Sequence, residues 1–252
     1  MIAEVGYKKV VYDKNEEIPE EFDARLKWPN CTSLRTIWYQ GLCGSCWAVS
    51  SASAMGDRHC IRTQEDVMLS AYDLMSCCKD CAPNGPCKGG YSHKAWKHWN
   101  TTGLVTGGPR ECSGCTCYRY LGVQFECDHK CRAVYGKSYD SDITHGREAK
   151  FLENNVELIQ REIMTNGPVV AAFEVFTDFV NISKGVYIHR SGKSLGYHAV
   201  RVIGWGVQHV SDEPVPYWLV ANSWGTHWGD EGLFRILRGG NHCQFESMVV
   251  AD

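Results

Sequence analysis

Gln40-Gly-Leu-Cys-Gly-Ser-Cys-Trp47 places two cysteines three positions apart, immediately before a run of small residues that continues to Met55. The run from Cys46 to Met55 is rich in Ala and Ser and predicts a helix that packs tightly into a core. Cys46 would lie in the first turn of this helix, where the helix dipole favours a thiolate. The two sulfurs are therefore candidates for a cross-link, a metal site or a reactive thiol.

Cysteine is abundant along the whole chain, with 14 among 252 residues. A chain of this length can bury a hydrophobic core without disulfides, and a reduced cytosolic protein would carry far fewer cysteines. Oxidative folding is the simplest explanation. Three acceptor patterns for Asn-linked sugar, at Asn30, Asn100 and Asn181, indicate the same secretory route.

The overall charge excludes some classes of partner. The formal net charge of −3 gives no basic footprint for nucleic acid or an anionic membrane surface. Neither a signal peptide nor an apolar run of about 18 residues is present, so we expect no membrane span. We also expect no metal and no cofactor.

The order of sequence patterns predicts a helical first half and a β second half. Residues 1–17 are polar and resemble an extended arm. Further helices are predicted at Leu69–Met75, with Ser70 as N-cap, at Ser92–Trp99 and at about Asn155–Thr165. The chain is therefore expected to be an α+β protein of two subdomains with the site in the cleft between them. The strands are predicted at Val169–Val175, Gly185–His189, His198–Trp205, Tyr217–Asn222 and Gly232–Leu237.

Local cysteine pairs leave two interpretations open. Zinc sites use such spacings, but in an oxidising compartment the same spacings close small disulfide loops, which we favour. Cys43 and Cys46 have the spacing of a redox pair, although no βαβ pattern surrounds them. The pairs in question are Cys78 with Cys81, Cys112 with Cys115, and Cys127 with Cys131.

A reduced Cys46 would need a histidine, a group that orients the histidine, and donors for an oxyanion. Among ten histidines, His198 stands out because it begins an apolar strand. Asn222 ends another apolar strand and is followed by Trp224. A core histidine and a turn asparagine are the plain alternatives, and the residues alone do not exclude them.

The opening motif resembles the signature of papain and cathepsin cysteine proteases. The resemblance extends from about Ile18 to the C-terminus, with His198 and Asn222 in the expected order after Cys46. Within the family it is similar to cathepsin B. The features that select cathepsin B are Phe22-Asp-Ala-Arg25, Trp28-Pro-Asn-Cys31, Cys77-Cys78, Cys87-Lys-Gly-Gly-Tyr91, Gly204-Trp-Gly206 and His242-Cys243.

The resemblance implies a papain-like fold, with a helical left domain over residues 18–140 and a β-barrel-like right domain over residues 141–252. Residues 1–17 would be the remainder of a propeptide. Cys46 would be the nucleophile and His198 the general base and acid. Asn222 would orient the imidazole, and Gln40 would donate to the oxyanion.

Substrate contacts are implied in the same way. The backbone of Gly89 and Gly90 would pair with an extended substrate. Glu246 would lie at the bottom of the S2 pocket, lined by Ala172 and Ala199, and would permit Arg beside apolar residues at P2. Trp224 would shield the bond between His198 and Asn222 from water.

The resemblance also implies most disulfides and leaves Cys46 and Cys243 free. The last two pairs in the following list are our preference among three possible connectivities. The expected pairs are Cys31 with Cys60, Cys43 with Cys87, Cys77 with Cys127, Cys78 with Cys81, Cys117 with Cys131, and Cys112 with Cys115.

One departure from cathepsin B concerns the occluding loop, which in that family carries two adjacent histidines. Here the stretch Cys117–Cys127 contains none, and His129 lies beyond it. We therefore expect an endopeptidase with little or no dipeptidyl carboxypeptidase activity, monomeric, in lysosomes or vacuoles or secreted. Its expected partners are peptide and protein substrates, its own propeptide and cystatin-like inhibitors. A non-catalytic, cysteine-rich extracellular binding protein on the same fold is the alternative.

Overall fold

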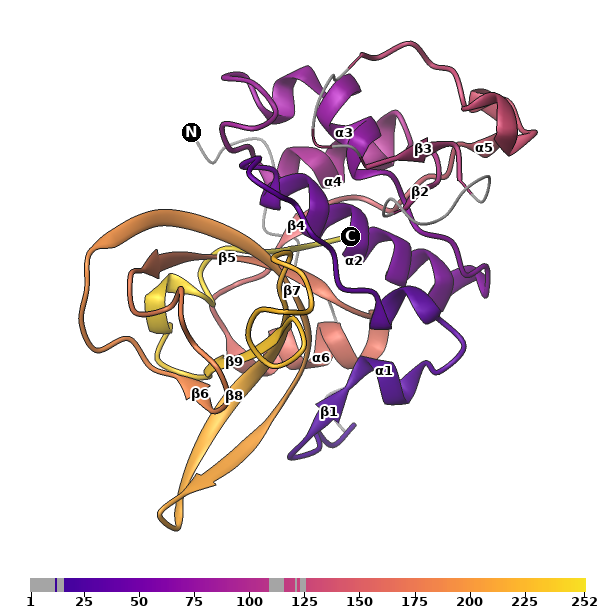
Figure 1. Cartoon of the computed structure of the whole chain (residues 1–252). Helices are drawn as coiled ribbons and strands as arrows, with labels where there is room; N and C mark the ends of the chain where they lie inside the picture. The colour runs from indigo at the N-terminus through magenta and orange to yellow at the C-terminus, as the bar shows by residue number, and fades with distance from the viewer. Residues whose placement is uncertain (1–11, 13–15, 109–115, 121, 123–125) are drawn as a thin grey trace.

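The computed structural model describes residues 12, 16–108, 116–120, 122 and 126–252. Helices gather in one half of the molecule and a large sheet forms the other, with helix α2 between them (Figure 1). The expected α+β arrangement is confirmed.

The helical half is built on α2 (Cys46–Thr63), against which α3 (Ala71–Cys77) and α4 (Ser92–Thr101) pack. Most of α2 is buried, and its serines bond back into the helix. The hydroxyl of Ser51, for example, donates to the Trp47 carbonyl at 2.6 Å. Small side chains and satisfied hydroxyls therefore let neighbours approach the helix on all sides. The Ser70 cap predicted for α3 is confirmed, because its hydroxyl accepts from the Asp73 backbone N–H at 2.9 Å.

The β half contains one sheet of eight strands among the described residues. Seven of them follow the order β4-β10-β5-β7-β8-β9-β6, and β1 pairs with Gly204 and Trp205 of β7. All five predicted strands are present, and β7 extends well beyond its predicted ends. The helix α6 (Val156–Asn166) precedes β5 and is capped by Asn155. The strands are β1 (Phe22–Asp23), β4 (Lys150–Phe151), β5 (Val169–Phe176), β6 (Val186–Tyr187), β7 (Ser194–Val210), β8 (Glu213–Ala221), β9 (Leu233–Leu237) and β10 (Val249–Ala251).

Shorter elements complete the described part of the chain. Two short strands, Gly107–Gly108 and Tyr118–Arg119, form a separate parallel pair beside α3. The remaining elements are α1 (Ala24–Lys27), β2 (Gly107–Gly108), β3 (Tyr118–Arg119), α5 (Tyr139–Asp142), and the 3-10 helices η1 (Thr32–Arg35), η2 (Lys79–Cys81), η3 (Ala133–Tyr135) and η4 (His242–Gln244).

Disulfides hold the loops of the helical half. Five of the six predicted pairs are confirmed, and the sixth, Cys112 with Cys115, lies outside the described residues. Cys46 and Cys243 are free, as predicted. The zinc interpretation fails for Cys78 with Cys81 and for Cys127 with Cys131, and so does the redox pairing of Cys43 with Cys46. The observed bridges are Cys31–Cys60, Cys43–Cys87, Cys77–Cys127, Cys78–Cys81 and Cys117–Cys131.

Three buried ion pairs clamp α2 to the β half. Asp57 accepts from Arg201 of β7 at 2.7 Å, and the next residue, Arg58, bonds Asp252 at 2.6 Å and also Glu162 of α6. These side chains are at most a few per cent exposed. Breaking such a pair by removing one partner costs about 3–5 kcal/mol, so the helix is fixed firmly relative to the sheet.

The described part of the N-terminal arm lies against this clamp. The Tyr12 hydroxyl donates to Glu162, and the Glu16 carbonyl accepts from Arg161 at 2.8 Å. Glu162 also binds Arg58, which is 12 residues along α2 from Cys46, or about 18 Å at the rise of a helix. These arm residues therefore bond α6 beside the second half of α2, away from the candidate nucleophile.

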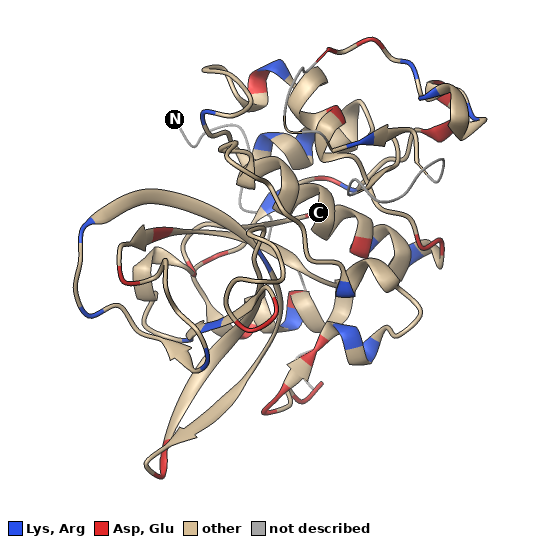
Figure 2. Ribbon diagram, viewed as in Figure 1, with Lys and Arg blue, Asp and Glu red and all other residues tan. Residues whose placement is uncertain are grey.

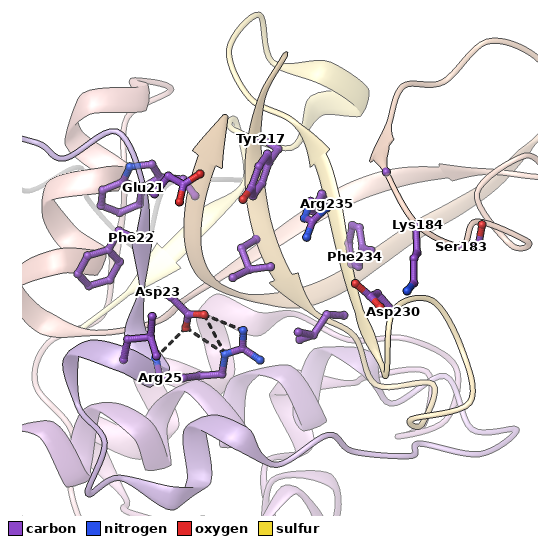
Figure 3. Close-up of a pocket in the computed structure, with 15 residues that line it drawn as sticks. Glu21, Phe22, Asp23, Arg25, Ser183, Lys184, Tyr217, Asp230, Phe234 and Arg235 are labelled. Carbon is purple, nitrogen blue, oxygen red and sulfur yellow. Dashed lines mark hydrogen bonds and ion pairs between the residues drawn. The ribbon is translucent and has the colours of Figure 1, made fainter. Parts of the chain in front are cut away.

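A groove of about 470 Å3 crosses the outer face of β7, β8 and β9 (Figure 3). Its wall is the N-terminal segment, where Arg25 forms an ion pair with Asp23 at 2.6 Å. None of Cys46, His198, Asn222 and Gln40 lines it.

Lys and Arg are interspersed with Asp and Glu over both halves (Figure 2). No helix in the described part of the chain is long and apolar enough to cross a membrane.

Candidate active site

Cys46 is the first residue of α2, and the loop before it is fixed on both sides. Cys43 is bonded to Cys87. The Gly44 N–H donates to the Cys87 carbonyl at 2.9 Å, and the Gly44 carbonyl accepts from Gly89 N–H at 3.1 Å. A Cβ at Gly44 would lie 2.6 Å from the Cys87 carbonyl oxygen, so only glycine permits this close approach. The disulfide and the strand-like pairing together hold the free thiol at the helix N-terminus.

His198 lies across the subdomain boundary from Cys46 and hydrogen-bonds to its side chain. The ring nitrogen Nε2 of His198 is engaged as well, because it lies 2.7 Å from Asn222 Oδ1. His198 comes from β7, and Asn222 follows the last residue of β8, which pairs with β7. The site residues of the β half are thus set side by side by the sheet, as the family resemblance implies.

The two titrating groups favour an ion pair. Burial alone would raise the pKa of the Cys46 thiol, but the charge and hydrogen bond of His198 and nearby backbone donors lower the pKa below its ordinary value. Burial alone would lower the pKa of His198, whereas the Cys46 thiolate and the bond to Asn222 raise it. Each group therefore stabilises the charged form of the other.

Trp224 covers the histidine. Its ring centroid lies 4.9 Å from that of His198, and the ring packs in turn on Trp228 at 4.9 Å. Asn222 is 3% exposed and His198 is 7% exposed. A hydrogen bond in such a dry setting is stronger than one in water, and the bond between His198 and Asn222 has this advantage.

The Gln40 side chain is held in one orientation. Its Oε1 accepts from the Ser223 hydroxyl at 2.5 Å, and its Nε2 donates to the Cys43 carbonyl at 2.8 Å. The Gln40 backbone N–H also bonds the Ser223 carbonyl at 2.9 Å, which ties it to the strand end that carries Asn222. Because an amide nitrogen has two hydrogens, one remains to donate to a ligand.

Gly89 and Gly90 lie beside the nucleophile loop, but the reason for glycine differs between them. Gly89 has φ of +84° with open space where a side chain would begin, so its conformation requires glycine. A Cβ at Gly90 would lie 2.6 Å from the ring of Trp47. Packing inside the helical half, rather than access for a substrate, accounts for the second glycine.

Ala172, Ala199 and Met248 share one face of the sheet. Ala172 is directly opposite Ala199, and its N–H donates to the Met248 carbonyl at 3.0 Å as β10 continues its pairing with β5. The preceding residues on this face, Val170 and Val250, pack against the helical half. Opposed residues of neighbouring strands point to the same side. We therefore expect these three side chains to form a small apolar hollow at the next position outward, and sequence reasoning missed Met248 in it.

Glu246 does not face this hollow, and the structure does not support its sequence-based assignment. The residue is 1% exposed. One carboxylate oxygen accepts from the Trp218 indole at 2.9 Å and from Gly239 N–H at 2.7 Å, and the other accepts from Asn241 N–H at 2.6 Å. Three donors saturate the group inside the β half. Its role in the described structure is to hold the turn before η4.

The remaining sequence-predicted residues lie outside this site. His129 is turned away, with its ring 4.8 Å from that of Tyr139 and its Nε2 3.1 Å from the sulfur of Cys127. Asn30 and Asn181 are exposed. Asn100 is only half-exposed, and its amide nitrogen donates to the Gly146 carbonyl at 3.1 Å. Asn30 and Asn181 are therefore the better candidates for glycosylation.

Comparisons with known proteins agree with this geometry. Residues 18–252 match the model of the papain family cysteine proteases. A cathepsin B-like cysteine proteinase of Schistosoma japonicum is 44% identical, over 95% of this chain and 74% of that protein. Cathepsin B-like cysteine proteinase 6 of Caenorhabditis elegans is 43% identical, over 94% of this chain and 67% of that protein.

A solved structure is similar as well. The procathepsin B S9 structure from Trypanosoma congolense superposes with a TM-score of 0.84 at 35% identity, and the match covers 98% of this chain and 82% of that one. The free cysteine at a helix N-terminus, its bonded histidine and the family match agree. The chain therefore belongs to the papain family of cysteine proteases, among its cathepsin B-like members.

Proposed function

We propose that this cysteine peptidase is an endopeptidase that works through a Cys46 thiolate and a His198 imidazolium. The observation that carries the proposal is the bonded series Cys46, His198, Asn222, in which the pKa of the thiol is lowered and that of the imidazole is raised. A thiolate is the nucleophilic form of cysteine, so no separate deprotonation precedes attack.

Each residue has a defined part in the cycle. The Cys46 sulfur attacks the peptide carbonyl carbon, and the carbonyl electrons move to oxygen, where Gln40 Nε2 and the Cys46 backbone N–H donate to the oxyanion. When the C–N bond breaks, His198 protonates the leaving amine. Neutral His198 then takes a proton from water, which attacks the thioester and releases the acid and the thiolate. Asn222 keeps the imidazole aimed throughout.

The endopeptidase assignment rests on the segment between Cys117 and Cys127. Both ends are fixed by disulfides, to Cys131 and Cys77, and the stretch contains no histidine. His129, the nearest one, is held against Tyr139. No imidazole from this segment is thus available to bind the C-terminal carboxylate of a substrate, which favours a cleft open at both ends.

Apolar residues are proposed at P2. The hollow formed by Ala172, Ala199 and Met248 offers apolar surface, and burying a cation there without a partner is costly. The acid on the same face is Glu174, one position further out, opposite Tyr197 and bonded to Gln244 at 3.3 Å. A long basic side chain would reach an acid only at this outer edge.

A panel of fluorogenic peptides with free and amidated C-termini tests both points. We expect equal cleavage of the two forms within a few-fold, and a preference for Phe over Arg at P2 of at least about tenfold. Met248→Glu should reduce or reverse the Phe preference, because the new carboxylate would face the hollow and pair with Arg. A strong preference for peptides with a free C-terminal carboxylate would contradict the open cleft. Equal cleavage of peptides with Arg and with Phe at P2 would contradict the apolar preference and would assign P2 recognition of Arg to Glu174.

The pH profile reports the ion pair. Cys46, with a lowered pKa, acquires its charge at low pH, and His198, with a raised pKa, keeps its proton to high pH, so activity should be bell-shaped. Asn222→Ala removes one of the interactions that raise the pKa of His198. Activity should then be lost at a lower pH on the alkaline side, with the acid limb nearly unchanged. Values of kcat/KM measured between pH 4 and 10 would reveal the shift. An alkaline limb that is the same as in wild type would argue against the role of Asn222 in orienting His198.

Peptide and protein substrates, the chain's own propeptide and cystatin-like inhibitors remain the proposed partners, and a monomer the proposed state. Five disulfides in the described residues support the secretory route, to lysosomes or the outside of the cell. A non-catalytic binding protein is not favoured, because Cys46 is not in a disulfide and its thiol is hydrogen-bonded to His198.

A further inference from the structure

We propose that Tyr120 is a positioning residue for the oxyanion side of the active site, where its buried hydroxyl ties Gln40 to Ser45. The inference rests on the proposed function, since it concerns the two donors that Gln40 and Cys46 supply to the oxyanion. Tyr120 does not touch the reacting atoms. It acts through the peptide groups next to the two donors.

The contacts of the phenol are short and enclosed. The Tyr120 hydroxyl donates to the Gln40 carbonyl at 3.0 Å and lies 2.6 Å from the Ser45 hydroxyl. Because a phenol has one proton, and that proton is directed to Gln40, the serine hydroxyl is the donor in the second bond. This bond is much shorter than the alternative for the serine proton, the Cys43 carbonyl at 3.4 Å. Tyr120 is 6% exposed and Ser45 is fully buried. Burial raises the pKa of Tyr120, so the phenol remains a neutral donor.

Each of the bonded residues adjoins one oxyanion donor. Gln40 carries the side-chain donor, and its amide is otherwise set by Ser223 and Cys43. Ser45 is the N-cap of α2, so its peptide carries the backbone N–H of Cys46. A single hydroxyl thus fixes the separation between the two chain segments from which the donors come.

Tyr120 itself is held by elements that no catalytic side chain uses. It follows β3, and its N–H donates to the Gly108 carbonyl at 3.1 Å. Its ring meets Trp38 edge to face at 6.0 Å. Three residues earlier, Cys117 is bonded to Cys131. The segment that begins at Cys117 is therefore joined, through the Tyr120 hydroxyl, to the backbone that carries the oxyanion donors.

Loss of this hydroxyl should affect the transition state more than the bound substrate. Removing an oxyanion donor outright costs about 10²- to 10³-fold in kcat, and misplacing a group by 1 Å can cost about 10²-fold. Tyr120→Phe keeps the ring and both donors and loosens their relative position. We expect kcat for a peptide amide to fall about tenfold, with KM nearly unchanged.

The experiment compares two reactions of Cys46 in Tyr120→Phe and wild-type protein. Peptide hydrolysis develops an oxyanion, whereas alkylation by iodoacetamide needs the thiolate but forms no oxyanion. Hydrolysis should slow about tenfold, and the alkylation rate and its pH dependence should stay the same. Tyr118→Phe is the matched control. Tyr118 lies two residues away, and its hydroxyl donates to Asp128 at 2.8 Å and not to Gln40 or Ser45, so kcat should not change.

Two outcomes would overturn the inference. Equal hydrolysis by Tyr120→Phe and wild type would show that the hydroxyl is not needed, and equal loss in hydrolysis and alkylation would assign the effect to the ion pair or the fold. If Tyr120→Phe does not fold, Ser45→Ala removes the second bond from the other side and should give the same split between the two reactions. Wild-type protein that is alkylated but cleaves no peptide would instead refute the proposed function.

Discussion

Cys46→Ala is expected to lower kcat/KM for peptide cleavage by at least about 10⁴-fold, because no other group in the site can form the acyl intermediate. The side chain is small and is replaced at the first turn of α2, while the disulfide of Cys43 and the ion pairs of Asp57 and Arg58 remain. The variant should therefore fold normally. Circular dichroism and thermal unfolding would verify this, and hydrolysis of the peptide panel would measure the loss.

Cys243, the other free thiol of the described residues, provides the matched control. Burial, with the nearby charges of Asp178 and Glu174, raises the pKa of Cys243 to about 11. Cys243→Ala should retain full activity. At pH 6, iodoacetamide should label wild type and Cys243→Ala at one site and leave Cys46→Ala unlabelled, as counted by mass spectrometry. Labelling of Cys46→Ala at the wild-type rate would show that Cys46 is not the reactive thiolate.

Gln40→Ala is expected to reduce kcat by about 10²- to 10³-fold, the typical effect of losing one oxyanion donor. The Gln40 amide is held by Ser223 and Cys43 before any substrate binds, so the donor is in place without reorganisation. KM should change little, because the interaction strengthens only as charge develops on the carbonyl oxygen.

Gln40→Glu sharpens the test. It keeps the size of the side chain but places a carboxylate, which only accepts hydrogen bonds, where the donor stood. Its kcat should be no higher than that of Gln40→Ala. Steady-state kinetics with one amide substrate would decide, with iodoacetamide alkylation of Cys46 as the control for an intact thiolate. A kcat within a few-fold of wild type in both variants would remove Gln40 from the oxyanion site.

The secondary structure was largely predictable from local patterns. The small-residue run after Cys46 gave α2, and the Ser70 cap gave α3 within two residues of its predicted start. β7 was predicted nine residues too short, four at its start and five at its end, and most of the missed residues are exposed or half-buried. Periodicity marks where a strand is buried and does not mark where pairing stops.

The substrate pocket shows the limit of this approach. Glu246 and Met248 are two positions apart near the C-terminus, and only the acid has a chemistry that the sequence brings to notice. Which of them meets the hollow depends on the turn at η4 and on the register of β10 against β5. Gly90 is similar, since its need for glycine comes from Trp47, which is 43 positions earlier.

By itself the sequence determined the local elements, and with the family resemblance it indicated the nucleophile with its histidine and asparagine and the five disulfides that the structure confirms. These follow from short motifs, because the chemistry requires particular side chains in a particular order. Only the tertiary structure decided that Glu246 is saturated by backbone and indole donors, that Met248 lies beside Ala172, and that Tyr120 ties Gln40 to Ser45. Such contacts join segments tens of residues apart. Their geometry is set by packing and strand register, which no local pattern records.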